Sequence, residues 1–331
     1  MLKIMLRSRR GRVAGLLCAL LGAGVFPPAS AQEYPSKAVT LIVPFPAGSP
    51  PEVEARFLAQ FLSERSWKKP VVVEGRPGAG GVIAADYVVK SAPDGHTLLF
   101  VTAGITTFKI FTLNMTFDPA KDLAPVSLVT NAYGGLMINT MVPAKNLDEF
   151  VAYVKANSGK LNYGSAGRNT TMLIAEAFLR ANGIRMTEIP YAGQIQYVTA
   201  LMRNDVQMVN AGFNSTVKGQ IDGGAPLRPI LVAGERRSPL FPDVPTAAEK
   251  GWAIPGNSWN GMLAPASTPA RVVDALAVEV SRYAAAPDMQ KVAQGRGTEL
   301  VSSTPAEFKR KLEADTRAWT EVANSVGIKP E

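Results

Sequence analysis

The stretch VTLIVPFPAGSPPEVEARFLAQFL, from Val39 to Leu62, decides the fold. It opens with Val39–Val43, a β-branched and apolar run typical of a strand that is covered on both faces. Pro44 and Pro46 then remove backbone donors, and Gly48 frees the chain for a turn. Apolar residues follow at helical spacing, which predicts an amphipathic helix; they are Val53, Phe57, Leu58, Phe61 and Leu62.

This strand, loop and helix unit has a chemical consequence. A loop that leads from the carboxyl end of a parallel strand into a helix presents unpaired N–H groups and the positive end of the helix dipole. That arrangement suits an anion such as a carboxylate. An ordinary strand-to-helix connection has the same pattern, so this stretch alone leaves both interpretations open.

The rest of the chain alternates strands with helices in two series. Two more strand and loop units follow the first, at 70–81 and 97–104, and a second series runs from 147 to 232. The apolar segment 123–139 and the Pro-, Gly- and aromatic-rich segment 239–265 are predicted to pass between two lobes. We therefore predict an α/β fold in which each lobe is a mostly parallel sheet flanked by helices.

The domain boundaries follow from this pattern. We expect a signal peptide at 1–31, the first part of lobe one at 32–132, lobe two at 133–235 and a return to lobe one at 236–331. The last 65 residues are predicted to be mainly helical. Thr268-Pro269 and Thr304-Pro305 each place a capping hydroxyl before a proline at the first helical position, and Glu307 completes a capping box with Thr304.

The first residues are typical of a targeting segment. Basic residues precede the apolar run Val13–Phe26, which is too short to span a bilayer, and Ala29-Ser30-Ala31 offers small residues for signal peptidase. We expect export to the periplasm and a mature chain that begins at Gln32. The single cysteine, Cys18, lies in the removed segment, so the mature chain is expected to have no thiol chemistry.

Charge excludes one class of partner. The whole chain has 35 basic and 27 acidic residues, a net charge of +8. Five of the basic residues and none of the acidic ones precede Gln32, so the mature chain has 30 basic and 27 acidic residues, or +3. It has no basic run with interleaved aromatics, and we exclude nucleic acid as a partner.

The motifs of common enzymes are incomplete. The loop Gly75–Gly81 has no Lys-Ser/Thr pair after it, and Ile83 stands where a dinucleotide fingerprint needs glycine. Tyr163 stands where a nucleophile elbow around Ser165 needs glycine. The single histidine, His96, begins a strand and is interpreted as structural. The sequence predicts no enzyme, no cofactor and no metal site.

Six loops offer backbone N–H groups and hydroxyls instead, three in each lobe. Such donors bind carboxylates without a lysine or arginine. A cleft with these loops on both walls predicts a hinged protein that closes on a small anion. The candidate ligand residues are Phe45, Ala47, Gly48, Ser49, Glu52, Gly78, Ala79, Thr102, Ala103, Ser165, Gly167, Arg168, Asn169, Thr170, Thr171, Tyr191, Gly193 and Asn210.

Several ordered motifs carry a resemblance to a known family. They are VPFPAG, EGRPGAGG, PDGHTLLF, APVSLV, LNYGSAG, LFPDVPTAAE, WNGMLAPASTPA and SVGIKPE. Over nearly all of residues 33–331 the chain resembles the Bug, or TctC, family of extracytoplasmic solute-binding proteins of tripartite tricarboxylate transporters. The resemblance implies a two-lobed, type II-like periplasmic-binding-protein fold and a carboxylate ligand, such as a di- or tricarboxylate or an aromatic acid. It also implies ligand contacts from 45–49, 77–79, 165–171 and 191–193.

The chain departs from the family pattern in the expected cleft. Ser49 and Glu52 stand where the family often has glycine and aspartate, and Pro50-Pro51 stiffens the first loop. Arg168 replaces a small or amide residue; it either pairs with a second carboxylate in the cleft or is a loop charge in solvent. Glu52 either favours a neutral or amino-bearing ligand group or is a solvated residue near the helix dipole.

The expected function is capture of a small organic carboxylate and its delivery to the membrane subunits of a tripartite tricarboxylate transporter, by a protein expected to be a monomer. A periplasmic ligand sensor that docks on a sensor kinase is an alternative, because both roles use the same closed form. A secreted hydrolase is a third interpretation, which the residue inventory disfavours.

Overall fold

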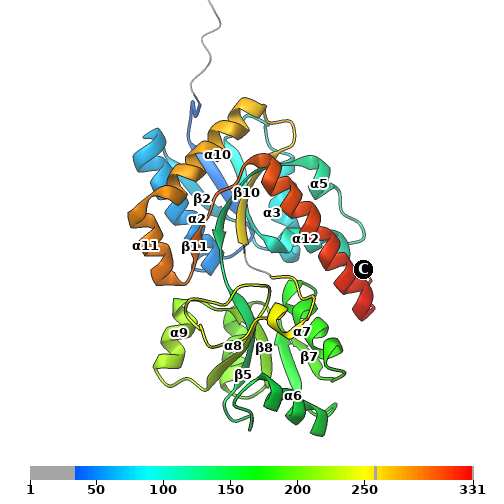
Figure 1. Cartoon of the computed structure of the whole chain (residues 1–331). Coiled ribbons are helices and arrows are strands. Elements are labelled where there is room, and N and C mark those ends of the chain that lie inside the picture. Colours follow the sequence, from blue (N-terminus) through cyan, green and yellow to red (C-terminus); the bar gives the residue numbers. More distant parts are fainter. Residues whose placement is uncertain (1–33, 257–258, 330–331) are drawn as a thin grey trace, which may run out of the picture. The chain divides into compact units, whose positions relative to one another are not determined.

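A computed structural model describes residues 34–256 and 259–329. The described residues from Lys37 onward belong to one compact unit. The predicted signal peptide lies outside the described residues. Two sheets organise the unit (Figure 1). The first has the strand order β11-β4-β10-β3-β1-β2 and the second β7-β6-β8-β5-β9.

The first sheet combines both strand directions. The strand β1 pairs in parallel with β2 and β3, whereas β10 and β11 pair antiparallel with their neighbours. The strands are β1 (Val39–Val43), β2 (Val71–Gly75), β3 (Thr97–Thr102), β4 (Leu123–Asn131), β10 (Trp259–Pro265) and β11 (Glu299–Leu300).

The second sheet is mixed in the same way. The strand β6 is parallel to β7 and β8, and β5 is antiparallel to β8 and β9. Its strands are β5 (Gly134–Asn139), β6 (Asn162–Ser165), β7 (Thr187–Pro190), β8 (Met208–Gly212) and β9 (Leu227–Val232). The two-lobed α/β class is confirmed, but the prediction of mostly parallel sheets is wrong. Two neighbouring parallel strands need a long connection, usually a helix, that brings the chain back to the same end of the sheet. The strands next to the crossovers enter their sheets without such a connection and pair antiparallel.

Both predicted crossovers are present. The chain leaves the first sheet with β4 and enters the second with β5, separated only by residues 132–133. It leaves the second sheet with β9 and returns to the first with β10. The segment 239–265 is predicted only as a crossover, but its last residues, Trp259–Pro265, form a strand in which every residue is buried.

Helices cover both sheets (Figure 1). The first-sheet part has α2 (Pro50–Phe61), α3 (Val82–Val89), α4 (Phe108–Phe111), α5 (Pro119–Asp122), α10 (Ala270–Ala285), α11 (Pro287–Arg296), α12 (Pro305–Val326), the π-helix η1 (Leu62–Trp67) and the 3₁₀ helices η2 (Ala79–Gly81) and η3 (Ala103–Thr107). The second has α6 (Leu147–Ala156), α7 (Thr170–Ala181), α8 (Gln194–Met202), α9 (Ser215–Asp222) and η4 (Ala248–Lys250).

The helix α2 buries more than its apolar face. Leu58 and Phe61 are buried as predicted, but Glu52 and Glu54 are buried too, while Phe57 is only half-buried. The carboxylate of Glu54 pairs with Arg296 at 2.7 Å, and the guanidinium lies 3.9 Å from the Phe57 ring centroid. A partner 242 residues away therefore makes burial of Glu54 possible.

Two helix starts were predicted from Thr-Pro pairs. Thr304 caps α12, and the reciprocal bonds of a capping box join it to Glu307, which confirms that prediction. The prediction for Thr268 is wrong, because α10 begins at Ala270 with Pro269 as its N-cap and no side-chain cap.

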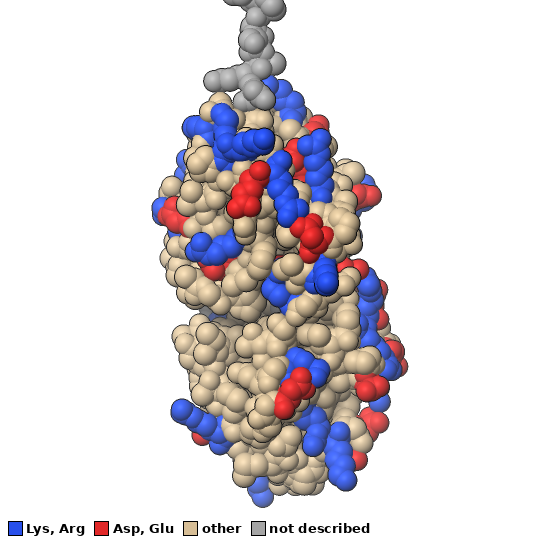
Figure 2. All heavy atoms as spheres, turned by 90° about the vertical axis from the view of Figure 1, so that its left-hand side faces the viewer, with Lys and Arg blue, Asp and Glu red and all other residues tan. Residues whose placement is uncertain are grey.

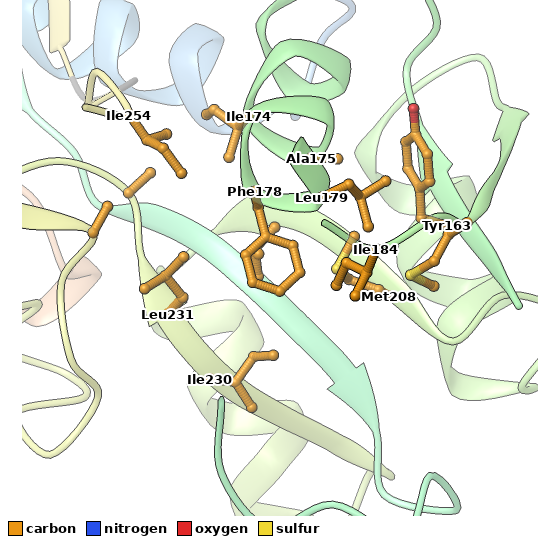
Figure 3. Close-up of a cluster of buried hydrophobic side chains, with 14 of the residues drawn as sticks. Tyr163, Ile174, Ala175, Phe178, Leu179, Ile184, Met208, Ile230, Leu231 and Ile254 are labelled. Carbon is orange, nitrogen blue, oxygen red and sulfur yellow. The ribbon is translucent and has the colours of Figure 1, made fainter. Parts of the chain in front are cut away.

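A hydrophobic cluster on one face of the second sheet extends to the C-terminal helix. It includes Tyr163, Phe178 and Met208 (Figure 3) and also Trp319, which is fully buried in α12. Since α12 follows β10 and β11 of the first sheet, this cluster joins the two parts of the fold.

Candidate functional site

The three candidate loops of the first sheet lie together. They follow β1, β2 and β3, which are neighbouring parallel strands, so their carboxyl ends share one edge of the sheet. The loops also touch one another: a Cβ on Gly81 would lie 3.2 Å from Pro44 Cβ, and a Cβ on Gly75 would lie 2.8 Å from the Phe45 oxygen. Loop 44–49 is therefore packed against the loop that follows β2.

The first loop is held by side chains of its own helix. The N–H of Gly48 donates to the Glu52 carboxylate at 3.0 Å, and the Ser49 hydroxyl donates to the Pro46 oxygen at 2.7 Å. The other carboxylate oxygen of Glu52 pairs with Arg56 at 2.5 Å. Glu52 is 2% exposed, so its interpretation as a solvated residue is wrong; the helix start folds its side chain back onto the loop.

The remaining candidates at this edge differ in exposure. Ala47, Gly48 and Ala79 are exposed, Phe45, Ser49, Gly78 and Thr102 are half-buried, and Ala103 is buried. Ala79 has a φ of 46°, in the left-handed region that non-glycine residues seldom adopt. The Thr102 hydroxyl accepts a hydrogen bond from Gly104 N–H at 3.3 Å. This edge thus offers mainly backbone groups.

The candidate loops of the second sheet also share an edge, since β6, β7 and β8 are parallel neighbours. The polar side chains of Ser165, Asn169 and Thr171, in and around loop 166–169, are already hydrogen-bonded. Ser165 is fully buried; its hydroxyl donates to Glu188 and accepts from Gly167 N–H at 2.8 Å. Asn169 caps α7 by accepting from Thr171 N–H at 2.8 Å, and the Thr171 hydroxyl accepts from Ala166 N–H at 3.1 Å. These side chains shape the loop.

The other two candidate segments flank that loop. The N–H of Tyr191 donates to the Ser165 oxygen at 2.9 Å, and Gly193 is the N-cap of α8. Sequence reasoning missed Gln194, whose side-chain oxygen accepts from Gly212 N–H at 3.0 Å and so joins the start of α8 to the end of β8. No local pattern indicates this contact. Tyr191 and Gly193 are half-buried, and Thr170 and Asn210 are buried.

Arg168 is exposed and extends toward the C-terminal segment. Its guanidinium donates to the Lys329 carbonyl oxygen and lies 5.6 Å from the Phe111 ring centroid. The two alternatives for this side chain were a second carboxylate in the cleft and solvent, whereas both contacts are with groups of the protein itself. Arg168 thus connects the second-sheet loop with Phe111 at the end of α4 and with Lys329 beyond α12.

Burial and neighbouring carboxylates shape the electrostatics beneath this edge. Tyr163 is fully buried and its hydroxyl donates to Glu176 at 2.5 Å. Burial, followed by that hydrogen bond, raises the pKa of Tyr163 well above its usual range. The phenol therefore stays protonated and serves as a donor. His96, at the other sheet's opposite edge, lies 3.2 Å from the Asp94 carboxylate and is 8% exposed, in agreement with a structural role.

Two cavities lie away from the candidate residues. One of about 490 Å³ is lined by Lys109, Thr112, Leu113, Met115, Thr116, Phe117, Asp118 and Asp122. The other, of about 420 Å³, is lined by Ala177, Arg180, Ala181, Gly251, Trp252, Ala253, Ile254, Val322 and Ser325. Neither includes a predicted ligand residue.

Two features are absent from residues 34–256 and 259–329. There, the structure has no cluster of three metal-ligating side chains and no helix that is long and apolar enough to cross a membrane. On the face shown in Figure 2, Lys and Arg side chains are interspersed with Asp and Glu.

The comparison with known proteins decides the family. Residues 55–328 match the tripartite tricarboxylate transporter family receptor, TctC. The chain belongs to this family. This TctC-family chain is 34% identical over 268 residues to the UPF0065 protein in the gbd 5' region of Cupriavidus necator, covering 81% of this chain and 80% of that one. It is 29% identical over 315 residues to protein BugT of Bordetella pertussis, covering 93% and 94%.

Solved structures share the fold of this TctC-family chain. The R. palustris protein Rpa4515 with adipate has a TM-score of 0.83 at 29% identity, covering 90% of this chain and 100% of that chain. The periplasmic binding protein BugD has a TM-score of 0.79 at 29% identity, covering 90% and 100%. MatC from Rhodopseudomonas palustris with bound malate has a TM-score of 0.77 at 27% identity, covering 87% and 99%. The family consists of solute-binding receptors and not of enzymes, and relatives bind adipate and malate.

Proposed function

We propose that this TctC-family receptor captures a small organic carboxylate in the cleft between its lobes and delivers it to the membrane subunits of a tripartite tricarboxylate transporter. One observation carries the proposal: in each sheet, three parallel strands end in loops of small residues at a shared edge. Backbone N–H groups in such loops, at helix starts, bind a carboxylate without a positive side chain. The adipate and malate of the relatives are carboxylates of this kind.

Export is the second part of the proposal. Residues 1–31 have the charged, apolar and small-residue regions of a signal peptide. The relative BugD is a periplasmic binding protein. We place the mature receptor, from Gln32 onward, in the periplasm, where a ligand drives closure because the closed form makes contacts that the open form lacks.

A thermal-shift panel of residues 32–331 tests the proposal. Candidate acids are malate, succinate, adipate, citrate, phthalate and glutamate, with the corresponding diamides and sodium sulfate as controls at equal ionic strength. At a free concentration of a hundred times the dissociation constant, a ligand stabilises the folded state by about 2.7 kcal/mol. A shift with an acid but not with its diamide supports the proposal, and the absence of a shift with every acid overturns it.

A pair of variants locates the binding. Ala47→Asp places a negative charge in the exposed first loop and should abolish the shift, because like charges repel. Ala266→Asp places the same charge at an exposed residue after β10, at the opposite edge of the same sheet, and should leave the shift unchanged. Equal effects of the two substitutions would contradict a site at loop 44–49.

A further inference from the structure

The hydroxyl of Ser165, one of the predicted ligand residues, already has partners inside the protein. Ser165 is fully buried, and its hydroxyl donates a hydrogen bond to the Glu188 carboxylate and accepts one of 2.8 Å from Gly167 N–H. A hydroxyl has a single proton to donate, and here that proton is directed at Glu188. Ser165 is therefore placed to hold the loop that follows it.

Glu188 lies beside Ser165 because of the strand register. In the parallel pair of β6 and β7, Glu188 is level with Tyr163. Side chains alternate between the two faces of a sheet, so Tyr163, Ser165 and Glu188 project from the same face. Tyr163 packs in the cluster that includes Leu179 of α7 (Figure 3), so this is the face that α7 covers. The pair thus lies beneath the start of that helix.

Ser165 and Glu188 connect the loop to another strand. The hydrogen bonds of Asn169 and Thr171 stay within residues 166–171, whereas that of Ser165 reaches β7. Gly167, whose N–H the Ser165 hydroxyl holds, has a φ of 74°, so the chain turns there before it reaches Asn169, the N-cap of α7. Holding the N–H of Gly167 therefore fixes the position of this short loop relative to the sheet.

The carboxylate determines which way the hydroxyl points. A carboxylate only accepts hydrogen bonds, so the Ser165 hydroxyl must donate to Glu188 and turn a lone pair elsewhere. In this structure that lone pair accepts from Gly167 N–H. A hydrogen bond to a charged acceptor is also stronger than one between neutral groups.

We propose that Glu188, acting through the Ser165 hydroxyl, is a positioning residue for loop 166–169, which forms one wall of the ligand site. This inference rests on the proposed function and specifies how that wall is held. A loop that is already held loses less conformational entropy when a ligand binds, so positioning increases affinity. Glu188 thus contributes to binding as a hydrogen-bond acceptor for Ser165, and neither side chain contacts the ligand.

Variants at the two ends of the bond should have the same effect. Ser165→Ala removes the hydroxyl and Glu188→Leu removes its acceptor, and each should weaken the binding of a carboxylate about fivefold. The double variant should also lose about fivefold, because both changes remove one and the same hydrogen bond. Glu188→Gln keeps an acceptor and should bind within about twofold of the unmodified protein.

Hydrogen exchange measures the loop without a ligand. In the mature protein, residues 32–331, peptides that span 166–169 are followed by mass spectrometry in the absence of any acid. Both Ser165→Ala and Glu188→Leu should increase the exchange rate of this loop about fivefold, since the bond that holds Gly167 N–H is lost. Glu188→Gln should restore the rate of the unmodified protein.

Calorimetry on the same proteins measures affinity for malate, succinate, adipate, citrate, phthalate and glutamate. Thr116→Val is the matched control, because the Thr116 hydroxyl also donates to a carboxylate, that of Asp86 at 2.7 Å, but lies outside the candidate loops. It should change neither the exchange of 166–169 nor the affinity for any acid. Urea unfolding of each variant ensures that folded proteins are compared.

The outcomes are separable. If Ser165→Ala leaves the exchange of the loop or the affinity unchanged, if Glu188→Gln behaves like Glu188→Leu, or if the two single losses multiply in the double variant, this inference is overturned and the carboxylate receptor stands. If Glu188→Leu does not fold, Glu188→Ala takes its place with the same expectation. Failure of the unmodified protein to bind any of the acids overturns the proposed function, whereas the exchange rates still decide whether Glu188 and Ser165 hold the loop.

Discussion

The backbone N–H of Gly48 donates a hydrogen bond of 3.0 Å to the buried carboxylate of Glu52, so the first turn of α2 holds the loop that precedes it. The side chain reaches back from the third helical position, as the acidic residue of a capping box does, but it passes the N-cap Ser49 and binds the residue before it. A carboxylate of the protein therefore already occupies one N–H of the proposed anion site.

Removing the Glu52 carboxylate should reduce the affinity for the ligand by more than it reduces the free energy of unfolding. Glu52→Ala frees the loop, and we expect a loss of about 1 kcal/mol in unfolding free energy, the usual magnitude for a helix cap. Affinity for the acid found in the panel should fall further, since the loop is no longer held in one conformation. Glu52→Gln keeps an acceptor for Gly48 N–H and should restore most of the affinity. Urea unfolding and calorimetry measure the two effects.

The second sheet provides a control for this prediction. Glu149 accepts from Lys145 N–H at 2.7 Å, the same reach-back contact at the start of α6. Glu149→Ala should lower the free energy of unfolding by about as much as Glu52→Ala does, and it should leave the ligand affinity unchanged. A Glu52→Ala variant that binds as tightly as the unmodified protein would show that the held loop does not matter for the ligand.

Arg168 gives a second prediction. Because its guanidinium contacts the Lys329 carbonyl and the Phe111 ring, Arg168→Ala should lower the unfolding free energy by about 0.5–1 kcal/mol. It should change the affinities of mono- and dicarboxylates by the same factor, since the effect is on the loop. Arg180→Ala, at an exposed arginine in the last turn of α7, the helix that follows Arg168, is the control. A loss confined to dicarboxylates would instead place the guanidinium on the second carboxylate.

Strong periodicity made much of the fold predictable. The strand β3 (Thr97–Thr102) begins where the predicted unit 97–104 begins, and α6 (Leu147–Ala156) begins where the second series was predicted to begin, because an apolar run and a capped amphipathic segment are local signals. The strand β10 was missed because Asn260, Gly261 and Pro265 interrupt its apolar pattern; its burial comes from β3 and β4 on both sides. The helix α9 was missed because Val217 is its only buried residue.

For the site, the sequence could predict where the loops lie but not how their side chains are used. Loops that follow parallel strands must share an edge, whatever their residues. The partner of Gln194 on β8, the contact of Arg168 with Lys329 and the burial of Glu52 depend on tertiary packing, which no local pattern contains. The predicted ligand role of each candidate residue stays a prediction.

Low pH should reduce the stability of the folded protein, because carboxylates that are paired in the fold become protonated. The hydrogen bond from Lys90, and then that from Thr116, lowers the pKa of Asp86 below its ordinary value of 3.8. A carboxyl group whose pKa is lower in the folded state stabilises the fold above its unfolded pKa, and this contribution is lost as pH falls through the folded value. Asp86→Asn should therefore reduce stability at pH 6 and have little effect near pH 2. Urea unfolding across this range measures the difference, and a difference that is the same at both pH values would contradict the assignment.

Gly135 in β5 is required by close packing of the second sheet. A Cβ at this position would lie 1.9 Å from the Leu231 carbonyl oxygen and 2.9 Å from Val232 Cα, and both contacts are with backbone that cannot rotate away. Gly135→Ala must push β5 and β9 apart, and we expect a loss of at least about 3 kcal/mol in unfolding free energy. Gly219 in α9 has no atom within 4 Å of its Cβ position, so Gly219→Ala should instead gain about 0.5–1 kcal/mol from helix propensity. Urea unfolding compares the two variants, and a Gly135→Ala protein within about 1 kcal/mol of the unmodified one would mean that this sheet can widen at β5.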